Sequence, residues 1–65
     1  MQKKDLEDFI EKYGCKVKIV LDNHFGITGL VVEIRDDVVV FSGNKETSFI
    51  PYDIIHYITD KTGGR

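Results

Sequence analysis

Three side chains of this 65-residue sequence are of the types that most often do chemistry near neutral pH: Cys15, His24 and His56. A nucleophilic cysteine needs a neighbouring imidazole and an electropositive setting. The two histidines lie far apart in the sequence and have no paired carboxylate, although either could bind a ligand or sense pH. We therefore expect Cys15 to be a small buried residue at a helix–strand junction, and the histidines to be surface residues.

The remaining polar residues form no recognisable catalytic pattern. The sequence has no phosphate-cradling glycine loop, no nucleophile with a placed base, and no spacing typical of zinc ligands. We predict that the protein is not an enzyme and uses no metal, cofactor or small-molecule substrate. A single cysteine, with neither a signal-peptide pattern nor a long apolar run, predicts a cytoplasmic protein that does not enter a membrane.

The stretch KKDLEDFIEKYG, near the start, has the period of an amphipathic helix. Asp5 lies in the first turn, where the helix dipole favours negative charge, and Gly14 can end the helix with a positive φ. The pattern predicts a helix over about residues 4–13, with one apolar stripe made of Leu6, Phe9, Ile10 and Tyr13.

After Gly14 the hydrophobic period changes to two, which is typical of strands. In the first strand Lys16 and Lys18 alternate with apolar residues, and Val20 is the apolar exception on the outer side. Turn residues and Pro51 separate the later strands. The expected strands cover about residues 16–21, 25–34, 38–41, 47–50 and 54–58. They would form one barrel domain over residues 15–58, followed by a frayed tail over residues 59–65.

Gly29 lies inside the longest apolar strand, where a glycine weakens a sheet unless the chain must bend. Both sides of this strand are apolar, with Ile27 and Val31 on one and Leu30, Val32 and Ile34 on the other. We therefore predict a mainly β fold with one N-terminal helix, in which five antiparallel strands bend into a small barrel and the helix covers one open end.

So short a chain also predicts assembly. A domain of this length buries only roughly 60% of its unfolded surface, and one cysteine cannot form an internal disulfide. The outer strands would expose unpaired backbone groups, which proteins commonly protect with charged side chains. These strands carry few charges, so we expect their edges to pair with another copy. Head-to-tail pairing of unlike edges gives a closed ring of identical copies.

The order of elements, together with NHFGITGLV and FIPYDIIHYI, resembles the Sm-like superfamily and within it the Hfq family. The likeness covers about residues 5–58 and places Asn23, Phe25, Gly29 and Val31 on positions of the Hfq pattern. It implies a homo-oligomeric ring of about five to seven copies. It also implies that single-stranded RNA binds in the pore or on the ring faces, as in an RNA chaperone or riboregulator.

On this resemblance, six residues are candidates for contacting RNA: Tyr52, Asn23, Phe25, Lys16, Lys18 and Arg35. Tyr52 could stack on a base or instead pack at a subunit interface. Lys16 and Lys18, repeated around a ring, would offer phosphates a multivalent track, or would simply be the solvated face of a strand.

The sequence also departs from the Hfq pattern. The turn that carries Lys-His in Hfq reads Pro51-Tyr52 here, and the net charge of −2 offers no basic excess for phosphates. Acidic residues occur in the loops at Asp36, Asp37 and Asp53. The C-terminal domain of the ribosome-maturation factor family has a similar small barrel and a last turn like IPYDII. The alternative function is a structural or adaptor module that keeps the ring but binds protein.

Overall fold

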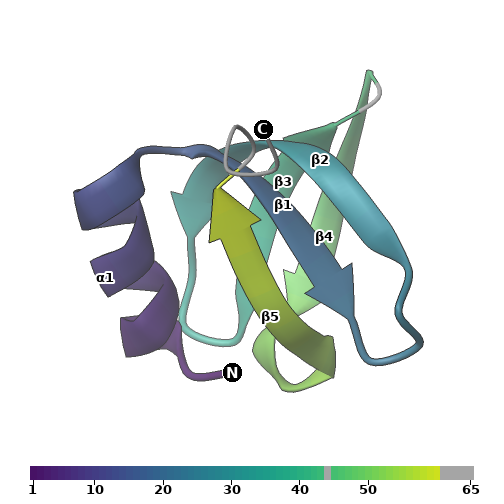
Figure 1. The fold of residues 1–65 in the computed structure, drawn as a ribbon, viewed down its shortest axis with the longest axis horizontal. Helices are drawn as coiled ribbons and strands as arrows, with labels where there is room; N and C mark the ends of the chain where they lie inside the picture. The colour runs from purple at the N-terminus through teal and green to yellow at the C-terminus, as the bar shows by residue number, and fades with distance from the viewer. Residues whose placement is uncertain (44, 61–65) are drawn as a thin grey trace.

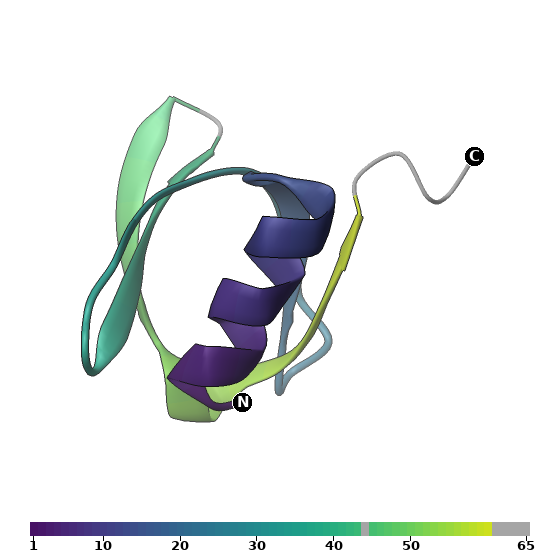
Figure 2. The same cartoon turned by 90° about the vertical axis from the view of Figure 1, so that its left-hand side faces the viewer.

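A computed structural model describes residues 1–43 and 45–60. In the described part, α1 (Lys3–Tyr13) precedes β1 (Lys16–Leu21), β2 (Gly26–Ile34), β3 (Val38–Gly43), β4 (Glu46–Pro51), the 3₁₀ turn η1 (Tyr52–Ile54) and β5 (Ile55–Asp60). The strands form one antiparallel sheet in the order β4-β3-β2-β1-β5. The sheet curls on itself and α1 lies across one end, which confirms the predicted fold (Figures 1 and 2).

The helix forms where its apolar period predicts it. The Asp5 carboxylate accepts a hydrogen bond from the backbone N–H of Gln2 (3.3 Å), and Gly14 ends the helix with a φ of 92°. Leu6 is fully buried, whereas Tyr13, expected in the same stripe, is 48% exposed. Tyr13 lies in the last turn, where its ring packs on Phe9 (centroids 4.6 Å apart) rather than in the core.

The end of β5 and the exposure of Cys15 differ from the sequence prediction. β5 continues through Asp60, and Thr59 and Asp60 pair with Lys18 and Val17, so these two residues are not part of a frayed tail. Residues 61–65 of that predicted tail lie outside the described residues. The prediction that Cys15 is buried is wrong, because the chain turns there between α1 and β1 and only the Cys15 carbonyl joins the sheet, accepting from Val31 N–H (2.9 Å).

The hydrophobic core fills the space between the curled sheet and α1. Every strand contributes at least one buried residue, and Leu6 enters from the helix. Val20 is also buried, although it lies on the outer side of β1 as predicted. The main core cluster consists of Leu6, Val17, Ile19, Val31, Val39, Phe41, Ile50, Tyr52, Ile55 and Ile58.

At Gly29 the backbones of β2 and β3 leave no room for a side chain. A Cβ on Gly29 would collide with the carbonyl oxygen of Ser42 and lie 2.8 Å from Cα of Gly43. A Cβ on Gly43 would in turn lie 2.7 Å from the carbonyl oxygen of Thr28. Both neighbours are backbone atoms that cannot rotate away, so the sharp bend of the sheet requires glycine here.

A β-bulge completes the bend of β2. Val31 pairs with Phe41 and Glu33 pairs with Val40, which leaves Val32 as an extra residue without a partner. The bulge reverses the inward and outward phases. Ile34 therefore packs against the core on the same side as Val31, whereas simple alternation placed it with Leu30 and Val32 on the other side.

Tyr52 links η1 to the β2–β3 turn at the end of the barrel that α1 covers. Its side chain is 7% exposed, and its hydroxyl donates a hydrogen bond to the carbonyl of Arg35 (2.6 Å) in the β2–β3 turn. Burial raises the pKa of Tyr52 above the usual value for a phenol. Close by, Lys3 of α1 donates to the Asp36 carboxylate (3.0 Å), and this bond raises the pKa of Lys3.

Because the backbones of β2 and β3 lie so close at Gly29, we predict that Gly29→Ala destabilises the fold by about 1–3 kcal/mol, the usual cost of overpacking. Gly26→Ala is the matched control, because a Cβ there would meet only the flexible end of Lys18. Urea denaturation followed by circular dichroism measures both. Equal stability of the Gly29 and Gly26 variants would contradict the proposed steric role of Gly29.

The Tyr52 hydrogen bond predicts that Tyr52→Phe costs about 1 kcal/mol at neutral pH. Because the unfolded phenol loses its proton first, the contribution of Tyr52 to stability is complete below a pH of about 10 and declines as pH rises through the higher folded pKa. The free energy of unfolding, measured by denaturation from pH 8 to pH 11, should therefore fall more steeply with pH in the wild type than in Tyr52→Phe. Parallel losses would refute the burial of this hydroxyl.

Candidate functional site

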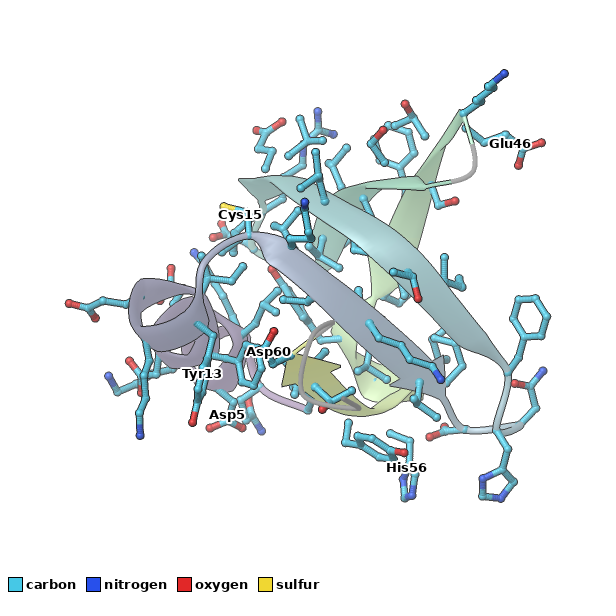
Figure 3. All side chains as sticks on the ribbon, turned by 45° about the horizontal axis from the view of Figure 1, so that its top comes forward. Asp5, Tyr13, Cys15, Glu46, His56 and Asp60 are labelled. Carbon is cyan, nitrogen blue, oxygen red and sulfur yellow. The ribbon has the colours of Figure 1, made fainter. Side chains whose placement is uncertain are left out.

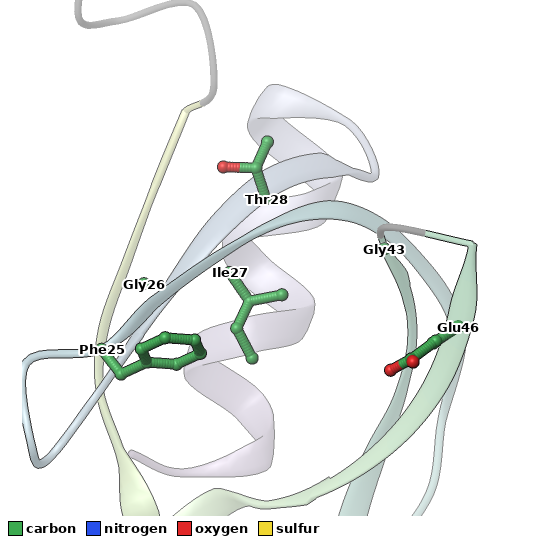
Figure 4. Close-up of a pocket in the computed structure, with 6 residues that line it drawn as sticks. All are labelled: Phe25, Gly26, Ile27, Thr28, Gly43 and Glu46. Carbon is green, nitrogen blue, oxygen red and sulfur yellow. The ribbon is translucent and has the colours of Figure 1, made fainter.

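The barrel end opposite α1 is open and forms a hollow of about 430 Å³. Figure 4 shows that Phe25, Ile27 and Glu46 point toward the space inside the curled sheet, whereas Thr28 points away from it. The lining also includes Gly26, Gly43 and Thr28, although the Thr28 side chain points outward. The hollow thus combines an aromatic ring, an aliphatic side chain and one carboxylate, which suits a flat, partly polar group.

The turn between β1 and β2 presents Phe25 at this hollow. The Asn23 side-chain oxygen accepts a hydrogen bond from the backbone N–H of Phe25 (2.9 Å), and Leu21 N–H donates to the Phe25 carbonyl (2.9 Å). These bonds fix the backbone of the turn while the Phe25 ring stays 61% exposed. Asn23 therefore acts as a positioning residue, and Phe25 offers a free aromatic face.

Neither candidate lysine is among the residues that line the hollow. The end of the Lys18 side chain lies over Gly26, and Lys18 pairs in the sheet with Thr28, whose side chain points away from the hollow, so Lys18 lies on the outer side of the barrel wall. Lys16 is exposed at the other end of β1, opposite Leu30. From the sequence-predicted set the structure therefore brings Asn23 and Phe25 together at the hollow, with Lys18 on the outer side of the same wall.

The other two candidates lie elsewhere. Arg35 forms an ion pair with Glu33 (3.3 Å) and lies over the Phe49 ring, 5.4 Å from its centroid. Tyr52 is buried in the core of its own chain, so its ring cannot present a face to a base or to a neighbouring subunit. We therefore leave Tyr52 out of the candidate surface.

Sequence reasoning missed the contributions of Thr28 and Glu46 to the hollow. Glu46 reaches it because the β3–β4 hairpin folds back beside the start of β2, and neither its residue type nor its position in the sequence signals this. Leu30 (47%), Val32 (63%) and Phe49 (56%) are also exposed apolar residues, on the outer side of the sheet or at its edge.

The two edges of the sheet are the second candidate interface. Within the described residues β4 and β5 are the outer strands, and each has a neighbour on one side only. β4 carries the exposed Phe49, and β5 carries the exposed Tyr57 (49%). Both edges thus combine unpaired backbone with an exposed aromatic side chain, which favours pairing with another strand.

Neither a metal centre with three or more protein ligands nor a membrane-spanning helix occurs in the part of the chain that the structure describes. No group of three or more His, Cys, Asp or Glu side chains gathers there in a way that could hold a metal ion. No helix there combines the length and the apolar character needed to cross a bilayer.

Comparison with known proteins identifies the fold. No protein-family model and no curated protein matches the sequence. A crystal structure of Hfq, described as a pleiotropic translational regulator, matches the structure with a TM-score of 0.70 and 25% sequence identity, covering 86% of this chain and 92% of that one. With one N-terminal helix and five antiparallel strands in the same arrangement, the chain has an Sm-like fold similar to that of Hfq.

Proposed function

We propose that this chain assembles into a homo-oligomeric ring that binds single-stranded RNA and acts, in the cytoplasm, as an RNA chaperone or riboregulator. The observation that carries the proposal is the open hollow with Phe25 exposed on an Sm-like barrel similar to that of a translational regulator. No catalytic role is part of this proposal.

Ring formation follows from the two unlike edges. β4 of one copy would pair with β5 of the next, so every copy uses both edges once and the ring closes without leaving an exposed edge. The same contacts would cover Phe49 and Tyr57. Assembly also supplies the buried surface that a chain of this length lacks.

RNA contact would come from stacking at the hollow. The exposed ring of Phe25 would stack on a base, and Glu46 would accept hydrogen bonds from base N–H groups. Lys18, on the outer side of the same wall, would meet a phosphate where the RNA leaves the hollow. Repetition around the ring would compensate for the net charge of −2 per chain, because each copy adds one further weak contact to the same strand.

A protein-binding adaptor of the same fold is the second candidate. It is favoured by the acidic residues Asp36, Asp37 and Asp53, all of which are exposed, and by the burial of Tyr52. In this function the ring would be retained, while the carboxylates would repel phosphate and attract basic segments of a protein.

The ring proposal predicts a particle several times heavier than the 7.4 kDa chain and unchanged by dilution. Tyr57→Lys places a charge on the β5 edge and should shift the protein toward monomer, because edge charges oppose strand pairing. Val32→Lys, at an exposed position of the central strand β2, is the control and should keep the wild-type mass. Light scattering after gel filtration measures all three, and a wild-type mass of 7.4 kDa at every concentration would disprove the ring.

The RNA proposal predicts binding of labelled oligo-A or oligo-U at micromolar protein in low salt, weakened at higher salt. Phe25→Ala should lose about 1–3 kcal/mol of binding free energy, the usual worth of one stacked base. Tyr13→Ala removes an exposed aromatic residue of α1 far from the hollow and should bind as the wild type does. An intact ring that binds neither oligonucleotide would instead support the adaptor function.

A further inference from the structure

The two histidines, 32 positions apart in the sequence, meet at the surface of the folded chain. The ring centroids of His24 and His56 are 5.8 Å apart, and the ring planes are nearly perpendicular, at 86°. Both side chains are exposed, and Figure 3 shows His56 projecting outward from the barrel. The Tyr57 ring packs edge-on against His56, with centroids 5.3 Å apart, so it limits the motion of that imidazole.

The backbone at His24 adopts an unusual conformation. Its φ is 69°, in the left-handed region that residues other than glycine adopt only at a cost. Its N–H donates to the Leu21 carbonyl (2.8 Å), and the Asn23 bond to Phe25 N–H closes the same turn. The turn therefore holds an imidazole at a position whose backbone conformation favours glycine.

His56 lies at an irregular position of its own strand. Val20 pairs with Tyr57 and Leu21 pairs with Ile55, so His56 is the extra residue of a β-bulge in β5. A bulge redirects the side chain of its extra residue away from the regular alternation of the strand. Asp22 N–H also donates to the Ile54 carbonyl (2.9 Å), which fastens the β1–β2 turn to the segment just before β5. Both imidazoles thus stand on backbone segments that are bonded to each other.

We propose that His24 and His56 form a two-imidazole binding site for a first-row divalent transition-metal ion of the Zn²⁺ class. Each neutral imidazole offers one nitrogen lone pair, and imidazole suits zinc, copper and nickel. Two imidazoles bound to one Zn²⁺ at about 2.0–2.1 Å place their ring centroids on the order of 5 Å apart. Small rotations of the two side chains would bring their ring centroids from the present 5.8 Å to that distance. Water would fill the remaining coordination positions.

The site shares no ligand with the hollow and needs no RNA. It uses His24 and His56, neither of which lines the hollow. Its occupation would add a cross-link between the β1–β2 turn and β5. The folded chain would therefore be stabilised by the ion, since an unfolded chain does not hold the two imidazoles together.

The test uses the whole chain and ZnCl₂ as the probe, in calorimetric titration and thermal unfolding. The wild type should bind one Zn²⁺ per chain and unfold at a higher temperature with Zn²⁺ than without it. His24→Gly suits the left-handed backbone and should keep the fold, but it should weaken Zn²⁺ binding at least about tenfold, and His56→Gln should weaken it by a similar factor. MgCl₂ should give no heat, because magnesium prefers oxygen ligands.

Lys45→Gly is the matched control for the backbone change. Lys45 also has a left-handed φ, at 66°, in the β3–β4 turn, and its replacement should leave Zn²⁺ affinity unchanged. The proposal is overturned if His24→Gly binds Zn²⁺ as the wild type does, or if only one of the two histidines matters. A stoichiometry of one ion per two chains would also overturn it, because the ion would then lie between copies.

Discussion

The close approach of β2 and β3 at Gly29 and Gly43 is the constraint on which the rest of the fold depends. At that point two backbones occupy space that a Cβ would need, so the sheet folds over sharply instead of continuing as an open, gently twisted surface. The bend allows five short strands and one helix to enclose a common core. It also brings the β3–β4 hairpin beside the start of β2, which creates the hollow at the open end.

Within the described residues, the same sheet leaves β4 and β5 each paired on one side only. A barrel that closed fully would pair β4 with β5, but in this sheet they remain at opposite ends of the strand order. The helix end is closed differently, by the side chains of α1 and by the Tyr52 hydroxyl bound to the Arg35 carbonyl. One end of the molecule is therefore sealed within the chain, while the edges and the opposite end stay available for other molecules.

The β1–β2 turn, near the open end, is held by several hydrogen bonds. Within four residues it contains the Asn23 side-chain bond, the left-handed His24 and the exposed Phe25. Neighbouring side chains of the turn thus belong to two different surfaces. Phe25 lines the hollow, and His24 lies beside His56 of β5. The backbone bonds of the turn hold both in place, so a change in the turn itself would disturb the proposed RNA contact and the proposed metal site together.

The amino-acid sequence by itself determined the elements and much of the fold. The periods of 3.6 and 2 predict the helix and the strands, and Gly29 predicts the bend, because these signals are local and depend on which side of an element is buried. Only the tertiary structure decided the sites. Glu46 joins the hollow, His24 meets His56 and Tyr52 turns inward because of strand register, two bulges and the curl of the sheet. These features fix neighbours that are distant in the chain, and no local pattern encodes them.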